Sequence, residues 1–149
     1  MTNKYIEEIL QINIVVKNVE KTIKNFEIYG VGPWIRDDGI SEVLRDRTAY
    51  GSECDYEFYA AFANIGDIEI ELIQPIDEKS DYYRFLMEHG EGVHHIAIKH
   101  NKENFKKLMN ERNISILQSG YWEGFGKYTY YDTFDDLGLV LEVYDKEGE

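Results

Sequence analysis

The chain has 149 residues, of which 43% are hydrophobic and 14% aromatic. This composition indicates a globular protein, and the length is sufficient for a sizeable hydrophobic core. The formal net charge of −13 argues against binding to nucleic acid, which needs a basic face, and against an anionic membrane surface. The single cysteine, Cys54, excludes an intrachain disulfide and a cysteine metal cluster. The charged start, MTNKYIEEIL, lacks the apolar core of a signal peptide, so we expect a cytoplasmic protein.

The first half of the chain predicts a strand, a helix, a turn that enters a strand, a two-strand hairpin and a second helix. These elements occupy residues 9–17, 18–29, 30–34, 56–74 and 79–89. Asn18 is the expected N-cap of the first helix, and Gly30 is expected to end it. The charged residues 35–51 indicate no definite element.

The second half of the chain predicts a strand, a helix and three further strands. These elements occupy residues 93–99, 102–111, 114–118, 127–133 and 139–144. The sequence Asp-Leu-Gly at 136–138 predicts the hairpin turn before the last strand.

The two halves follow one pattern, β-α-β-β-β. The segment QINIVVKN from Gln11 matches HIAIKHN from His95, and an amphipathic helix follows each. Gln11 and His95 are therefore expected at equivalent places on equivalent strands. With no linker in the sequence, we expect one domain over residues 1–149. Its two modules span about residues 8–76 and 92–145, and a helix at about 79–89 joins them.

Polar residues interrupt the apolar pattern of four predicted strands. They are Gln11, Glu71 in IEIELIQP, one of the pair His94 and His95 in GEGVHHIAI, and Glu142 in LGLVLEVYD. A buried carboxylate is costly unless it is paired or bound to a metal, and this mixture of donors suits a divalent ion such as Zn²⁺, Ni²⁺ or Co²⁺. A half-exposed sheet face in so acidic a chain also accommodates Glu and Gln. The residues alone leave open both the metal site and the choice of histidine.

The chain resembles the vicinal-oxygen-chelate superfamily over nearly its whole length. The matching segments are QINIVVKNVEKTI, GVGPW, IELIQP, GEGVHHIAI and LGLVLEVYD. The combination of IELIQP with GEGVHHIAI is similar to the methylmalonyl-CoA epimerase and glyoxalase-I-like branch. The resemblance implies an α+β fold: two tandem βαβββ modules that form a curved, mostly antiparallel sheet around a central cavity. It also implies a homodimer.

The resemblance further implies a divalent metal held by one residue from each of four strands. Carried over by position, these ligands are Gln11, Glu71, His95 and Glu142, and His94 would point to the opposite face. Glu71 and Glu142 would also be the catalytic acid and base. Epimerases usually begin the first strand with His, whereas this chain has Gln11, and the set Gln, Glu, His, Glu is like that of some zinc glyoxalases.

The activity implied is that of a metal-dependent lyase or isomerase that removes a proton next to a carbonyl group. A methylmalonyl-CoA epimerase-like activity on a thioester is the first interpretation, and a glyoxalase-I-like activity on a thiol hemithioacetal is the alternative. A third is a metal-free small-molecule binding or resistance protein, a class that tends to lose the ligands kept here. Arg36, Arg45 and Arg47 form the best basic cluster for a CoA phosphate, although neighbouring carboxylates largely cancel their charge.

Overall fold

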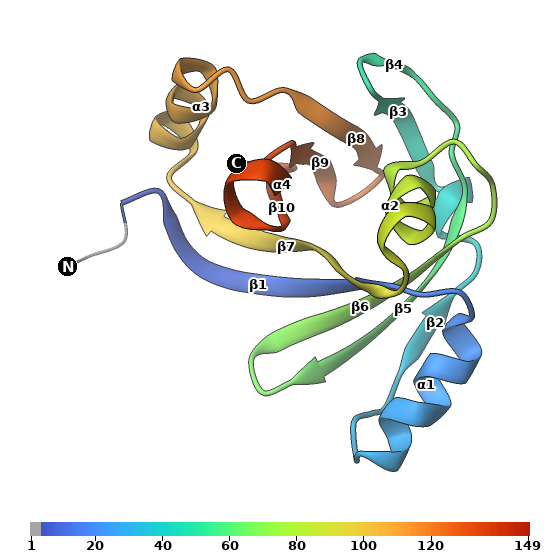
Figure 1. Cartoon of the computed structure of the whole chain (residues 1–149). Helices are drawn as coiled ribbons and strands as arrows, with labels where there is room; N and C mark the ends of the chain where they lie inside the picture. The colour runs from blue at the N-terminus through green and yellow to red at the C-terminus, as the bar shows by residue number, and fades with distance from the viewer. Residues whose placement is uncertain (1–3) are drawn as a thin grey trace.

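The strands of the protein form one strongly curved sheet that draws on both halves of the chain (Figure 1). The structure is a computed structural model that describes residues 4–149. Residues 1–3, which begin the charged N-terminal segment, lie outside the described residues. Within the described part of the chain, the ten strands lie in the order β2-β5-β6-β1-β7-β10-β9-β8-β3-β4.

The elements have the following bounds. The strands are β1 (Ile6–Val15), β2 (Ile35–Asp37), β3 (Leu44–Ala49), β4 (Ser52–Glu53), β5 (Phe58–Ile65), β6 (Ile68–Pro75), β7 (Gly92–His100), β8 (Ile116–Trp122), β9 (Gly126–Tyr131) and β10 (Val140–Lys146). The helices are α1 (Val19–Ile28), the 3-10 turn η1 (Ile40–Glu42), α2 (Asp81–His89), α3 (Lys102–Glu111) and α4 (Phe134–Leu137). None of these helices, in the part of the chain that is described, is long and apolar enough to cross a membrane.

The internal repeat is visible in how the strands pair. In the first half β1 runs parallel to β6, in the second half β7 runs parallel to β10, and β1 and β7 lie antiparallel at the centre. In the β1–β6 pair, Gln11 lies beside Glu69 and Asn13 beside Glu71. In the β7–β10 pair, His95 lies beside Val140 and Ala97 beside Glu142. Gln11 therefore occupies the place of His95, and Glu71 the place of Glu142. This confirms the α+β fold with a mostly antiparallel, curved sheet.

Helices α1 and α3 cover the outer face of the sheet, whereas α2 lies within its curve (Figure 1). The apolar residues of α1 pack on Ile70 and Leu72, which alternate with Glu71 and so face the opposite side. Phe105 of α3 packs in the same way on Leu141, beside Glu142. Helix α2 and the polar residues of the central strands lie on the inner face.

The helix ends follow the local sequence closely. The Asn18 side chain accepts a hydrogen bond from the Lys21 backbone N–H at 3.0 Å, so it caps α1 as expected. Gly30 follows with φ of 82°, which suits a glycine after a helix end. Helix α2 begins at Asp81, two residues later than expected, because the Ser80 side chain accepts from the Tyr83 N–H and caps it.

Two segments differ from the expectation. Residues 35–51, which indicated no element, contain β2, η1 and β3, and β3 pairs antiparallel with β8 of the second half. This pairing joins segments about 70 residues apart, so local alternation could not reveal it. The predicted hairpin turn at 136–138 is the end of the short helix α4, and Gly138 closes it in the left-handed conformation with φ of 77°.

Replacing Gly120 with Ala should destabilise the fold, because the Tyr128 ring lies directly over it. A Cβ atom at Gly120 would lie 2.3 Å from the Tyr128 hydroxyl, which is held in turn by Tyr56. We expect a loss of about 1–3 kcal/mol in the free energy of unfolding, measured by urea denaturation. The matched control is Gly92→Ala in β7, where a Cβ meets nothing within 4 Å. Equal losses in the two variants would contradict this packing.

Candidate metal centre

The four candidate ligands lie on the four central strands and face the inner side of the sheet. Gln11 comes from β1, Glu71 from β6, His95 from β7 and Glu142 from β10. All are buried: their exposed fractions are 6%, 9%, 0% and 4%, respectively. In this structure the strands of a single chain supply the whole set.

Three of the four side chains meet directly. The His95 Nε2 atom lies 3.5 Å from Glu71 Oε1 and 3.4 Å from Glu142 Oε1. Both His95 Nε2 and Glu142 Oε1 are buried and make no hydrogen bond within the described part of the chain. Buried polar atoms almost always have a partner, so two unpaired atoms that face each other mark this as a place for something that the protein alone does not provide.

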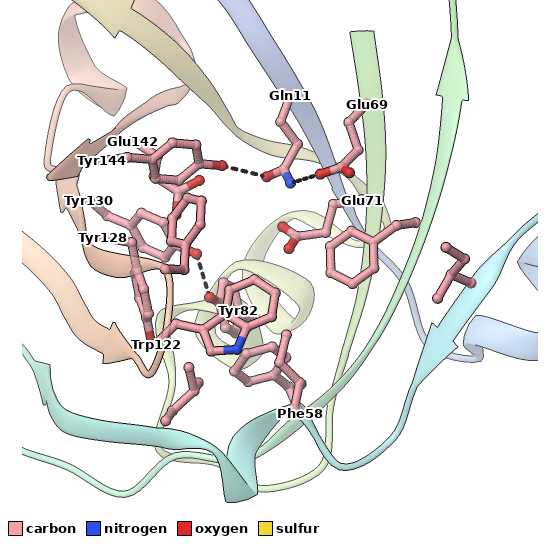
Figure 2. A pocket seen from close by; sticks show the side chains of 15 residues that line it. Gln11, Phe58, Glu69, Glu71, Tyr82, Trp122, Tyr128, Tyr130, Glu142 and Tyr144 are labelled. Atoms are coloured by element: carbon pink, nitrogen blue, oxygen red, sulfur yellow. Dashed lines mark hydrogen bonds between the residues drawn. The ribbon is translucent and has the colours of Figure 1, made fainter. Parts of the chain in front are cut away.

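Gln11 lies beside this group but is turned to other partners. Its amide N–H donates to Glu69 Oε1 at 2.6 Å, and its carbonyl accepts from the Tyr144 hydroxyl at 3.4 Å (Figure 2). Glu69 and Glu71 are two residues apart in β6, so both face the inner side of the sheet. This spacing is the feature of the sequence that could have placed Glu69 near the site. Asn13, two residues after Gln11 and on the same face, donates to Glu71 Oε1 at 3.2 Å and was not singled out from the sequence.

His94 lies on the same side of the sheet as His95, so the expectation that it would point to the opposite face is wrong. Pairing shifts from Asn13–His95 to Ile14–Val93, which leaves His94 as the extra residue of a β-bulge. Both imidazoles contact the ring of Tyr82, and the two Nδ1 atoms lie 2.8 Å apart. The bulge re-aims His94 from the outer face to a place behind His95.

Behind His94 lies Asp81, the first residue of α2, whose side chain has no exposed surface. Its carboxylate lies 2.7 Å from His94 Nε2 and also accepts hydrogen bonds from the Tyr50 hydroxyl and the Arg84 guanidinium, each at 2.5 Å. Burial raises the pKa of Asp81, but the hydrogen bonds from His94 and Arg84 outweigh it and hold that pKa below its usual value. Asp81 is therefore ionised at neutral pH, although no local motif indicated it.

This arrangement determines which imidazole nitrogens carry protons. Because Asp81 accepts, His94 Nε2 carries its proton; burial lowers the pKa of His94 to about 4, so its Nδ1 is an acceptor at neutral pH. His95 Nδ1 must then donate to His94. His95 Nε2 therefore faces the two carboxylates and is the atom that holds or releases the second proton of this imidazole.

The negative charges of Glu71 and Glu142 are only partly neutralised by His95. Burial raises the pKa of Glu71 above its usual value. Burial lowers the pKa of His95, but the negative charges of Glu142 and Glu71, at 3.4 and 3.5 Å, outweigh it and raise that pKa to about 9. A cation between the imidazole and the carboxylates, whether a proton or a metal ion, removes the repulsion.

The residues fit a divalent ion in donor type and charge, and one pair, His95 and Glu142, also fits it in spacing. Two carboxylates balance the charge of such an ion, and imidazole and amide donors complete a set suited to Zn²⁺, Ni²⁺ or Co²⁺. Two ligand atoms that each lie about 2.1 Å from one tetrahedral ion are about 3.4 Å apart, close to the His95–Glu142 separation. No group of three or more His, Cys, Asp or Glu side chains in residues 4–149 is arranged to hold an ion as it stands, so the side chains must adjust, and Gln11 must turn from Glu69.

The carboxylates form the polar end of a cavity of about 380 Å³ (Figure 2). Most of its wall is aromatic, with rings from β5, α2, β8, β9 and β10. Glu71 and Glu142 both line it, whereas His95 lies behind them against the ring of Tyr130, at 4.4 Å between ring centroids. A small molecule in the cavity would therefore meet the carboxylates first.

The chain matches a known protein family. The family model described as the Glyoxalase/Bleomycin resistance protein/Dioxygenase superfamily matches residues 10–131. A curated relative, the uncharacterized protein YqjC of Bacillus subtilis (strain 168), is 26% identical over 93 residues. That match covers 60% of this chain and 66% of the relative, just under two thirds of its length.

Solved structures with a similar fold include two methylmalonyl-CoA epimerases. The enzyme from Mycobacterium tuberculosis has a TM-score of 0.66 at 14% identity, with 98% of this chain and 92% of that chain covered. A Streptomyces coelicolor epimerase variant in complex with 2-nitronate-propionyl-CoA has a TM-score of 0.65 at 17% identity, with 96% and 99% covered. The hypothetical protein BH1468 from Bacillus halodurans C-125 has a TM-score of 0.65 at 20% identity, with 95% and 96% covered. At these identities the likeness is one of fold.

Replacing Asp81 with Asn should destabilise the protein, because His94 and Arg84 both lose a charged acceptor in a buried place. We expect a loss of about 2–3 kcal/mol in the free energy of unfolding, measured by chemical denaturation at neutral pH. The matched control is Asp55→Asn, which removes an exposed ion pair with Lys79 and should leave the free energy of unfolding nearly unchanged. If both variants lose the same stability, the buried network does not have the assigned role.

Proposed function

The chain belongs to the glyoxalase/bleomycin resistance protein/dioxygenase superfamily, and we propose that it is a metal-dependent isomerase or lyase that removes a proton next to a carbonyl group. One observation carries the proposal: a buried imidazole nitrogen and a buried carboxylate oxygen, both unpaired among the described residues, face each other at the polar end of an apolar cavity. Ionisable groups buried together at a cavity are typical of functional sites.

Gln11, Glu71, His95 and Glu142 would hold the divalent ion. When bound, such an ion supplies Lewis-acid stabilisation of the negative charge that develops on a carbonyl oxygen. The protein's own part is to hold His95 in the required tautomer through His94 and Asp81. Partners of this kind orient ligands in many metal sites.

Glu71 and Glu142 are the proposed acid and base. They occupy equivalent places in the two halves of the internal repeat and approach His95 from two different strands, β6 and β10. A planar, deprotonated substrate between them would meet one carboxylate on each face. An epimerase needs this arrangement, because the proton leaves one face and returns to the other. A lyase of the glyoxalase type needs one of the two carboxylates to return the proton to the neighbouring carbon.

The choice between these reactions depends on the substrate. Among the similar folds are methylmalonyl-CoA epimerases, one in complex with methylmalonyl-CoA and NH₄⁺, and this supports an epimerase-like activity on a thioester. The basic cluster expected for CoA offers less support. Arg36 is paired with Asp38, and Arg45 is paired with both Asp46 and Glu123, each within 2.8 Å. The glyoxalase-like alternative and a metal-free binding protein therefore remain as candidates, and a cytoplasmic homodimer stays a prediction.

The metal is tested first on protein purified without chelator. We expect about one divalent ion per chain by elemental analysis, and a rise in melting temperature when stripped protein receives Zn²⁺, Ni²⁺ or Co²⁺. His95→Ala should lose both the ion and the rise. The control His100→Ala replaces a half-buried histidine at the far end of β7 and should keep both. Absence of metal and of stabilisation in the wild type would favour the binding protein.

The chemistry is tested by proton exchange in deuterated buffer, followed by NMR. Metal-loaded protein should exchange the proton next to the carbonyl group of a substrate that it accepts, and methylmalonyl-CoA and methylglyoxal hemithioacetal are assayed as representatives of the two candidate reactions. Glu142→Gln should lower the rate about 10²- to 10⁴-fold, because a positioned acid–base group contributes that much, while its circular dichroism stays that of the wild type. Glu53→Gln, on the exposed β4, should keep the full rate. Full activity in Glu142→Gln would contradict the assignment.

A further inference from the structure

The walls of the cavity are chemically divided into two ends. Of the fifteen residues that line it, eight are aromatic and three are aliphatic. The remaining four are Gln11, Glu69, Glu71 and Glu142, which gather with Tyr144 at one end (Figure 2). The other end is formed by rings such as Phe58 and Trp122. A ligand that fills the cavity therefore needs a polar head and an apolar body.

The tyrosine hydroxyls in the apolar wall are already used within the protein. The Tyr82 and Tyr130 hydroxyls pair at 2.6 Å, and the Tyr128 hydroxyl pairs with that of Tyr56 at 2.6 Å. These three lining tyrosines thus present mainly ring carbon to the cavity. Apolar walls with few polar groups at fixed positions are typical of sites for small apolar ligands.

The charge of the wall also restricts the ligand. Three carboxylates line the cavity, and none of the described lining residues is Lys, Arg or His. A negative charge on the body of the ligand would meet no cation there and would be repelled by Glu69, Glu71 and Glu142. The nearby arginines are not part of this wall: Arg45 is held by Glu123 and Asp46, and Arg47 donates to the Tyr56 carbonyl.

The size of the cavity agrees with a single ring. A cavity of about 150 Å³ accepts benzene, so a volume of about 380 Å³ leaves room for a ring and a small polar head. A nucleotide-bearing thioester would have to extend far outside it.

We infer that the cavity takes a carbonyl compound with two neighbouring oxygens at one end and an uncharged, ring-sized apolar body, rather than an acyl-CoA. The inference rests on the proposed function, because the ion held by Glu71, His95 and Glu142 is what would bind the oxygens. The body then lies among the rings of α2, β5 and β8, where its burial supplies affinity and selects the substrate.

Two hydroxamates test the inference, because they share the same pair of oxygens and differ in the body. Binding of benzohydroxamate and acetohydroxamate to zinc-loaded protein is measured by isothermal titration calorimetry. We expect benzohydroxamate to bind at least about tenfold more tightly, since burial of a phenyl ring is worth that much. Trp122→Ala should reduce this ratio several-fold. Trp34→Ala, whose ring packs on Phe26 in α1, should leave it unchanged.

The outcomes separate this inference from the proposed function. Equal affinity for the two hydroxamates, displacement of benzohydroxamate by an equal concentration of propionyl-CoA, or no hydroxamate binding by a zinc-loaded chain would overturn the inference and leave the metal site standing. Failure to bind zinc would overturn the proposed function. A tighter complex of the metal-free chain with benzohydroxamate than with acetohydroxamate would then still support the apolar body.

Discussion

The antiparallel pairing of β1 with β7 is the contact on which the rest of the structure depends. It joins β6 and β1 of the first half to β7 and β10 of the second half in one continuous sheet. It sets Asn13 opposite His95, so that Glu71 from one half and Glu142 from the other approach the same imidazole. The polar end of the cavity and the internal two-fold arrangement follow from this register.

Charged groups are buried next to the β1–β7 pairing, and their burial lowers the stability of the fold. Two carboxylates and an imidazole lie together with little exposed surface, and a further carboxylate, Asp81, is fully enclosed behind them. Replacing such groups by well-packed apolar side chains is often neutral or stabilising in proteins. Their burial together is therefore best explained by chemistry at the site, which agrees with the unpaired atoms of His95 and Glu142.

Helix α2 connects the two sides of the site. Its first residue, Asp81, directs His94 and through it His95, while the next residue, Tyr82, lines the cavity and pairs with Tyr130. One short helix thus sets both the tautomer of the proposed ligand and the apolar wall against which a substrate would lie. The bulge at His94 makes the connection possible, because a regular strand would direct that imidazole to the outer face.

The sequence by itself determined most of the elements, the repeat and the inward face of the strands that carry Glu71 and Glu142. These depend on local periodicity, and the alternation around Glu71 and Glu142 places both carboxylates correctly from a few neighbouring residues. Contacts between segments that are far apart in the sequence were decided only by the tertiary structure. The pairing of β3 with β8, the bulge that re-aims His94, the approach of Asp81, and the turn of Gln11 toward Glu69 each join segments that no local pattern relates. Register between strands is set by packing and hydrogen bonding across the whole sheet, so it becomes definite only when the sheet is assembled.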